Sequence, residues 1–149
     1  MHWGTEYETT QNATQENLTN FLFKNGVDII LGSHPHVLQP MEKRSVVLDN
    51  GTQKDCFVIY SLGNFMSAQT QKNTRSSIIL NIEITKDGYS GSTTINNASY
   101  VPIYMYKSSN SSKKYRVLDI EKSIFKYESG IDSSIGTNNY SVLKSEFPH

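Results

Sequence analysis

Two histidines separated by one proline form the stretch of this sequence best suited to chemistry. His34 and His36 follow the apolar run 27–31, which is typical of a buried strand. Pro35 favours extended backbone at His34, and residues two apart in an extended chain point to the same side. Both imidazoles are therefore expected to face one pocket at the end of that strand, as metal ligands. A His-x-His pair is short and common, and on the residues alone a surface loop with two unrelated histidines explains it slightly better.

Composition restricts the class of protein. The 149 residues suffice for one domain with a core, and 14 basic and 14 acidic residues give no net charge. No basic stripe is present, so nucleic acid is not an expected partner. The single cysteine, Cys56, excludes an internal disulfide and a cysteine-based zinc site, and its apolar neighbours predict a small buried residue. No run approaches the roughly 20 apolar residues of a membrane span, and no signal peptide is visible, so the compartment is not readable.

The first residues are dense in functional side chains. Residues 2–7 read His-Trp-Gly-Thr-Glu-Tyr, yet no predicted strand precedes them to hold them in place. Chain ends usually fray, so His2 is expected to be disordered in this chain by itself. This start is also an early indication that the chain is part of a longer protein.

A helix is predicted over residues 12–25. Asn12 and Gln15 have the spacing of a capping box, and Gly26 suits the left-handed position after the last turn. The apolar face is expected to consist of Leu18, Phe21 and Leu22. The strand over 27–31 follows at once, which is typical of a helix–strand unit in a layered fold.

The rest of the chain is dominated by predicted strands. Residues 44–48 and 55–60 are expected to pair around the Asn50-Gly51 turn, with a polar loop over 66–74. Strands are then predicted over 77–85, 89–97, 98–106 and 115–118, and short helices over 119–128 and 139–147, each with an Asp or Asn cap. One face of the strand over 77–85 should be buried through Ile78, Leu80, Ile82 and Ile84. Pro102 favours an edge position or a bulge.

Three blocks together carry a family resemblance. Residues 2–7, 32–40 and 60–65, in this order and spacing, resemble the second half of a CapA-type protein, from the bacterial capsule or poly-γ-glutamate synthesis family. That family belongs to the calcineurin-like metallophosphoesterase superfamily. The resemblance extends from His2 to about residue 106, and the remainder is not covered.

The resemblance implies a fold. The parent domain would be an α-β-β-α sandwich, of which this mixed α and β chain would supply mostly one sheet with a flanking helix. Residues 1–106 would form the C-terminal half of the metallophosphoesterase-like domain, and 107–149 a C-terminal extension with short helices. Half a sandwich leaves an apolar sheet face uncovered, so the chain alone is expected to form a homo-oligomer, either a dimer or a strand-swapped assembly.

The resemblance also implies a metal site. His2 matches the lone histidine of the fourth superfamily block, and His34 and His36 match the pair of the fifth, here with an inserted Ser33. His2 and His34 would share one divalent ion, and His36 would bind its neighbour; mixed imidazole and carboxylate ligands suit Mn, Fe or Zn. Possible supporting or substrate-contacting residues are Trp3, Glu6, Tyr7 and Asn64. For Trp3 and Tyr7 a core role is equally compatible, and Glu6 would support a ligand histidine or simply face solvent. Asn64 fits a turn at least as well.

The departures from the family pattern matter as much. The first three blocks, which include the bridging aspartate and an Asn-His pair, have no match here, and Gly63-Asn64-Phe65 is not a substitute. No catalytic residue is therefore assigned. The chain by itself is expected to bind metal weakly or not at all, to lack turnover, and to need the missing N-terminal half of the domain as its partner.

Two functional classes follow. The first is a metal-dependent phosphoesterase-like hydrolase acting in capsule or poly-γ-glutamate production. The alternative is a non-catalytic scaffold or polymer-binding component of that machinery; a generic binding module is a third option, because fold does not fix function. By resemblance, the full-length protein would be membrane-anchored in the cell envelope and face outward. Its partners would be capsule-synthesis proteins or an anionic polymer.

Overall fold

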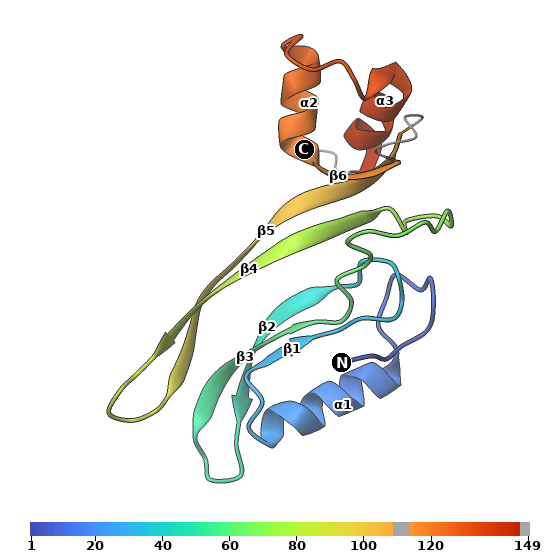
Figure 1. Ribbon diagram of the computed structural model, residues 1–149. Helices are drawn as coiled ribbons and strands as arrows, with labels where there is room; N and C mark the ends of the chain where they lie inside the picture. The colour runs from blue at the N-terminus through green and yellow to red at the C-terminus, as the bar shows by residue number, and fades with distance from the viewer. Residues whose placement is uncertain (109–113, 147–149) are drawn as a thin grey trace.

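The computed structural model describes residues 1–108 and 114–146, which fold into two small sheets and three helices (Figure 1). The elements in chain order are α1 (Ala13–Lys24), β1 (Ile29–Leu31), β2 (Met41–Val47), β3 (Gln53–Ile59), β4 (Ser76–Lys86), β5 (Thr93–Lys107), β6 (Tyr115–Asp119), α2 (Ile120–Glu128) and α3 (Gly136–Glu146). The predicted mixture of α and β is confirmed. The expectation of mostly one sheet is wrong, because β4, β5 and β6 form a second sheet.

The first sheet has the order β1-β3-β2, with β1 parallel and β2 antiparallel to β3. The predicted hairpin is confirmed, and Gly51 has the positive φ of 81° that the Asn-Gly signal indicated. The predicted buried strand over 27–31 is wrong in length and burial, since β1 has three residues and Leu31 is 46% exposed. Its start is displaced because the Val27 amide donates to the Leu22 carbonyl, which closes the end of α1.

Helix α1 begins as predicted, and Leu18 and Leu22 of its predicted apolar face pack on the core, but Phe21 does not. Asn12 and Gln15 form the capping box, and Gly26 has a φ of 98°. Phe21, however, is 60% exposed, whereas the buried residues are Gln15, Thr19 and Phe23. This stripe has the four-residue spacing of a helix face, but two of its three members are polar, so apolar periodicity could not reveal it.

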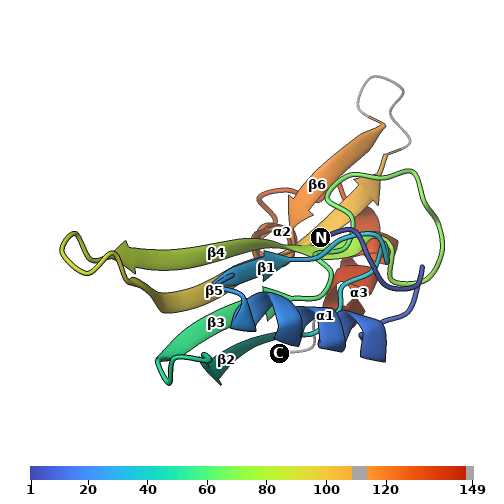
Figure 2. The same cartoon turned by 90° about the horizontal axis from the view of Figure 1, so that it is seen from below.

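The two faces of the first sheet carry different partners. Alternate residues of β3 point in opposite directions. Cys56, Val58 and Tyr60 pack with Phe23 of α1, whereas Phe57 and Ile59 pack against the second sheet. Cys56 is a buried free thiol, as predicted, and burial raises its pKa. The first sheet thus lies between α1 and the β4–β5 ribbon, and the two views show this ribbon running beside it (Figures 1 and 2).

The second sheet has the order β4-β5-β6. The two strands predicted over 89–97 and 98–106 are one strand, β5, which pairs with β4 through Ala98 without a break. Pro102 occupies an edge position, as expected, because pairing with β6 begins only at Ile103. Ile78, Leu80 and Ile82 face the core as predicted, but Ile84 is exposed because the register shifts between Glu83 and Ile84.

The C-terminal elements pack on the far end of β5. β6 is confirmed, and Asp119 caps α2 as predicted by accepting from the Lys122 amide. Helix α3 begins at Gly136, so the expected cap at Asn139 is wrong; Asn139 lies inside the helix, and its side chain donates to the carbonyl of Ile135, just before the helix. Residue 147, the end of the predicted helix, lies outside the described residues. Division of the chain after residue 106 stays a prediction. Across the described ranges, no helix combines the length and apolar character of a membrane span.

Candidate metal centre

Three loops meet at one end of the first sheet, and they carry all the predicted site residues. The segment before α1 pairs with the loop after β1, because the Trp3 amide donates to Ser33 O (3.1 Å) and Ser33 N donates to Met1 O (2.8 Å). The loop after β3 joins them through Leu62 N, which donates to Gly32 O (3.1 Å). His2 thereby forms a parallel bridge with Ser33, so the expectation that His2 is disordered is wrong.

The backbone of the His-Pro-His loop is not extended as predicted. His34 has a φ of 101° and His36 a φ of 63°, both in the left-handed region. Such conformations cost about 1–3 kcal/mol each and persist where surrounding contacts enforce them. Here the Pro35 carbonyl, between the two residues, accepts the Tyr7 amide at 2.8 Å. The two rings nevertheless lie close together, with centroids 6.1 Å apart, so they share one site by a different route from the one expected.

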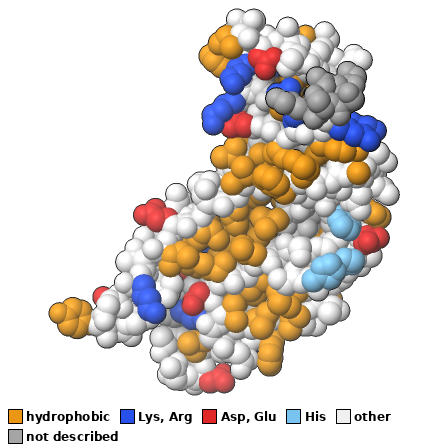
Figure 3. All heavy atoms as spheres, in the orientation of Figure 1, with side chains coloured by type: hydrophobic (Ala, Val, Ile, Leu, Met, Phe, Trp, Pro, Cys, Tyr) orange, Lys and Arg blue, Asp and Glu red, His pale blue; other side chains and the backbone are white. Residues whose placement is uncertain are grey.

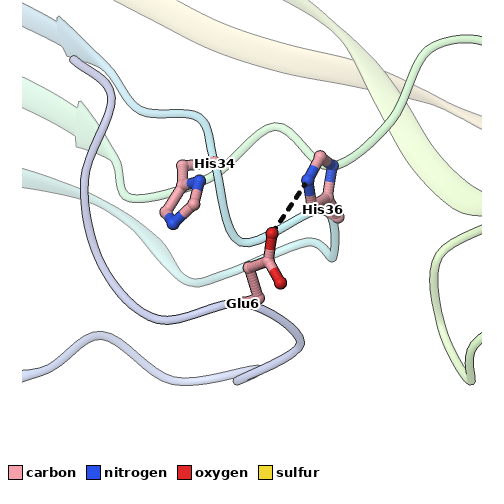
Figure 4. Close-up of side chains that lie close together, drawn as sticks. All are labelled: Glu6, His34 and His36. Atoms are coloured by element: carbon pink, nitrogen blue, oxygen red, sulfur yellow. Dashed lines mark ion pairs between the residues drawn. The ribbon is translucent and has the colours of Figure 1, made fainter.

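Glu6 joins the two histidines in a possible ligand set (Figure 4). One ligand atom from each of Glu6, His34 and His36 lies within 4.8 Å of the others, and Glu6 Oε1 is 3.7 Å from His36 Nε2. Tetrahedral ligands at about 2.1 Å from an ion stand about 3.4 Å apart, so a small inward movement of these partly exposed side chains brings all three into range. Two imidazoles and a carboxylate suit Zn, Mn or Fe, and the residues present therefore fit a divalent ion.

Asn64 fixes the tautomer of His36. Asn64 Nδ2 donates to the Thr74 carbonyl (3.2 Å) and to Gln69 Oε1 (2.8 Å). Because a carbonyl can only accept, the Asn64 amide must turn its Oδ1 toward His36 Nδ1, which lies 3.0 Å away. Nδ1 is then the donor, and the neutral ring keeps a lone pair on Nε2, the atom that faces Glu6. Ligand histidines in metal sites are oriented in this way by an acceptor on the other ring nitrogen.

His2 lies beside His34, with ring centroids 4.4 Å apart. This neighbourhood is compatible with the metal that the resemblance assigns to the two residues jointly. His2 is exposed and is not part of the group formed by Glu6, His34 and His36. Its role as a ligand stays a prediction.

Trp3 and Tyr7 have separate roles. Trp3 is buried against the first sheet, where Nε1 donates to Tyr60 O (2.8 Å) and the ring stacks on Tyr60. Gly32 is required there, because a Cβ on it would stand 1.9 Å from Tyr60 O. Tyr7 is exposed, has a φ of 67°, and stacks on His36 with centroids 6.1 Å apart. Tyr7 therefore lines the site, whereas Trp3 belongs to the core.

Sequence reasoning missed two glutamines that support this arrangement. In the sequence, Gln15 indicates only a helix cap, and Gln39 is only one member of the block 32–40. Both are buried, and Gln15 Nε2 donates to Gln39 Oε1 at 2.9 Å. Long-range pairing of polar side chains leaves no periodic signal, so nothing in the sequence could have revealed it.

Comparison with known proteins gives a consistent answer over the same loops. Residues 1–69 match the sequence model of the family described as bacterial capsule synthesis protein PGA_cap. Over 87 residues the chain is 40% identical to the PGA biosynthesis protein CapA of Bacillus subtilis (strain 168). The aligned region is 58% of this chain and 20% of the relative. The chain is 34% identical over 87 residues to the capsule biosynthesis protein CapA of Bacillus anthracis, covering 58% of this chain and 19% of the relative.

These matches cover only a small part of each relative. The chain spans about a fifth of the length of the curated relatives it matches. No solved structure matches the chain significantly. Residues 1–69 are thus similar to the bacterial capsule synthesis (PGA_cap) family, which confirms the predicted resemblance to CapA-type proteins.

Proposed function

We propose that this chain supplies the histidine-bearing part of a metal-dependent, phosphoesterase-like hydrolase that acts in capsule or poly-γ-glutamate synthesis. The names of the relatives support the capsule context. The observation that carries the metal chemistry is the convergence of Glu6, His34 and His36 ligand atoms within 4.8 Å. A cell-envelope location, and capsule-synthesis proteins or an anionic polymer as partners, belong to the same proposal.

The chain's own residues would divide the work as follows. His34 and His36 would hold the ion, with His2 beside them, and Asn64 would keep the His36 Nε2 lone pair available. Tyr7 would shield one face of the His36 ring. A divalent ion bound there would polarise a phosphoryl group and lower the pKa of a water molecule.

The donor set also argues that this chain alone is incomplete. Within residues 1–108 and 114–146, Glu6, His34 and His36 form the one cluster of at least three His, Cys, Asp or Glu side chains close enough to share an ion. No residue is assigned as a bridging carboxylate or as a general-acid histidine. We therefore expect weak metal binding and no turnover from this chain by itself.

A non-catalytic role in the same machinery is the second candidate. An open, mostly aliphatic groove of about 580 Å³ runs between β1 and β4 and ends at Ser33, beside the histidine loop. Figure 3 shows exposed hydrophobic side chains across this side of the molecule, with the histidines at their edge. A surface of this kind suits docking of another chain segment or protein, which is what a scaffold would need.

Calorimetric titration with Mn²⁺ and Zn²⁺ tests the metal proposal. One weak site is expected, and His34→Ala should abolish it. Two tight sites in this chain would contradict the incomplete donor set, and no binding at all would contradict the metal centre. In the complete gene product, an intact Gly-Asp start with an Asn-Asn-His block and hydrolysis of a phosphodiester would favour the hydrolase. Loss of both would favour the scaffold.

A further inference from the structure

We propose that Glu6 is itself a ligand of the metal held by His34 and His36, and that the buried amide pair Gln15–Gln39 positions it. This inference rests on the proposed metal centre and deepens it. The resemblance assigned only histidines from this chain, and Glu6 was expected to support one of them or to face solvent.

The first step concerns the atoms that face each other. Because Asn64 accepts from His36 Nδ1, the Nε2 atom of the neutral ring is an acceptor. Glu6 Oε1 stands 3.7 Å from that Nε2, too far for a hydrogen bond. Two lone-pair atoms thus point at a shared space, an arrangement that a cation between them stabilises. A nitrogen of His34 also lies within 4.8 Å, and a single proton cannot bridge three such atoms.

The second step concerns what holds the Glu6 loop. Gln39 is 3% exposed and uses its whole amide. Its Nε2 donates to Glu8 O (2.9 Å) and Thr10 O (3.0 Å), and its Oε1 accepts from Gln15. Gln39 therefore fixes the backbone directly after Glu6 to the loop that carries the histidines. Loss of the Gln39 amide would leave both carbonyls without this donor, which makes the contact hard to replace.

The third step ties the same loop to α1. Gln15 is 1% exposed, and its Oε1 accepts from the Asn12 amide at 3.0 Å. The Gln15 amide also fills the space above Gly4, where a Cβ would stand 2.8 Å from Oε1, and Gly4 has a φ of 82°. The loop that carries Glu6 is thus held on both sides by one pair of amides. Its carboxylate is presented to the histidines from a rigid support.

Glu6→Gln tests the ligand directly. Metal affinity of the Glu6→Gln chain for Mn²⁺ or Zn²⁺, measured by calorimetry, should fall about 10- to 100-fold or more. Glu8→Gln is the matched control, because Glu8 is an exposed carboxylate in the same loop that contributes only its backbone carbonyl to the Gln39 contacts. Its affinity should be unchanged. Glu6 is also exposed, so folding of the variant is not at risk.

Gln39→Met tests the positioning. Its metal affinity should fall about tenfold, and amide hydrogen exchange of residues 5–10 should accelerate even without metal. Gln53→Met, an exposed glutamine on the far hairpin, is the control for both measurements.

The outcomes separate this inference from the proposed function. If the Glu6→Gln chain binds metal as tightly as the wild-type chain, the assignment of Glu6 as a ligand is overturned, but the histidine metal centre is not. A wild-type chain that binds no metal would overturn the metal centre itself, and the ligand assignment with it. Unchanged exchange and affinity in Gln39→Met would overturn the positioning role.

Discussion

The two ends of this molecule bury different kinds of side chain. At the end that carries the histidines, polar residues are buried among the apolar ones, namely Gln15, Thr19, Gln39 and Ser61. At the other end, the cluster under α2 and α3 is wholly aliphatic and aromatic: Tyr104, Tyr106, Leu118, Ile120, Ile124, Ile135 and Leu143. Of the four described non-glycine residues with a left-handed φ, Tyr7, His34 and His36 lie beside the candidate site, and Asn73 lies in the loop between β3 and β4.

The two ends use these side chains for different purposes: the buried polar residues position loops of the candidate site, and the apolar cluster stabilises the fold. The hydrophobic effect that stabilises an apolar cluster has no preferred direction. Buried amides hold loops in place through directional hydrogen bonds, and the loss of one such bond destabilises the protein. The family match, over residues 1–69, coincides with the polar end. Within the described C-terminal residues, no cluster of His, Asp, Glu or Cys could hold an ion. The candidate metal ligands of the described residues therefore lie at one end.

The largest predicted effect is a loss of stability caused by a cavity in the apolar C-terminal cluster. Leu143 is fully buried in the C-terminal cluster, and Leu143→Ala should lower the free energy of unfolding by about 2–5 kcal/mol. Metal affinity of the folded fraction should stay unchanged, because Glu6, His34 and His36 do not belong to this cluster. Denaturant unfolding and calorimetry measure the two quantities. Loss of metal binding in a variant that remains folded would show that the two ends are coupled.

A smaller effect is expected from Asn64→Leu at the polar end. Without the Oδ1 acceptor, His36 is free to exchange tautomers, and metal affinity should fall about tenfold. Nitrogen NMR of the ring should show the Nδ1–H form in the wild type and a mixture in the variant. Asn17→Leu, on the exposed side of α1, should change neither. A single unchanged tautomer in Asn64→Leu would exclude the assigned role.

The smallest effect concerns the groove between the two ends. Leu31 and Ile79 line it and are 46% and 43% exposed, so the chain by itself should self-associate through this surface. Ile79→Lys should weaken association, measured by light scattering over a concentration series. Phe125→Lys removes an exposed apolar side chain on α2, outside the groove, and should leave association unchanged. A wild-type chain that stays monomeric at high concentration would contradict the prediction.

Much of the fold could be predicted because its signals are local. The Asn12 capping box, the Asn50-Gly51 turn and the Asp119 cap each depend on residues within a few positions of one another. The errors share a different origin. The break predicted within β5 and the apolar face assigned to Phe21 both depended on neighbours that only the folded chain supplies.

The candidate site shows the same division. The residue types and their spacing pointed to His2, His34, His36 and a nearby Glu6 without any coordinates. The extended geometry expected around Pro35 was wrong, because the Pro35 carbonyl is held by the Tyr7 amide from a separate loop. Asn64 was named, but its effect on His36 depends on the Thr74 carbonyl ten residues away.

The sequence by itself determined which side chains are available, where the helices start and which loops carry the histidines, since these follow from bonded neighbours and helix or strand periodicity. Only the tertiary structure decided that Glu6 faces the histidine pair and that Trp3 belongs to the core. Only it showed that Gln39 joins two loops. The physical reason is that hydrogen bonds between residues about 30 positions apart, such as Gln39 to Glu8 and Thr10, form when packing brings the segments together. No local pattern encodes them.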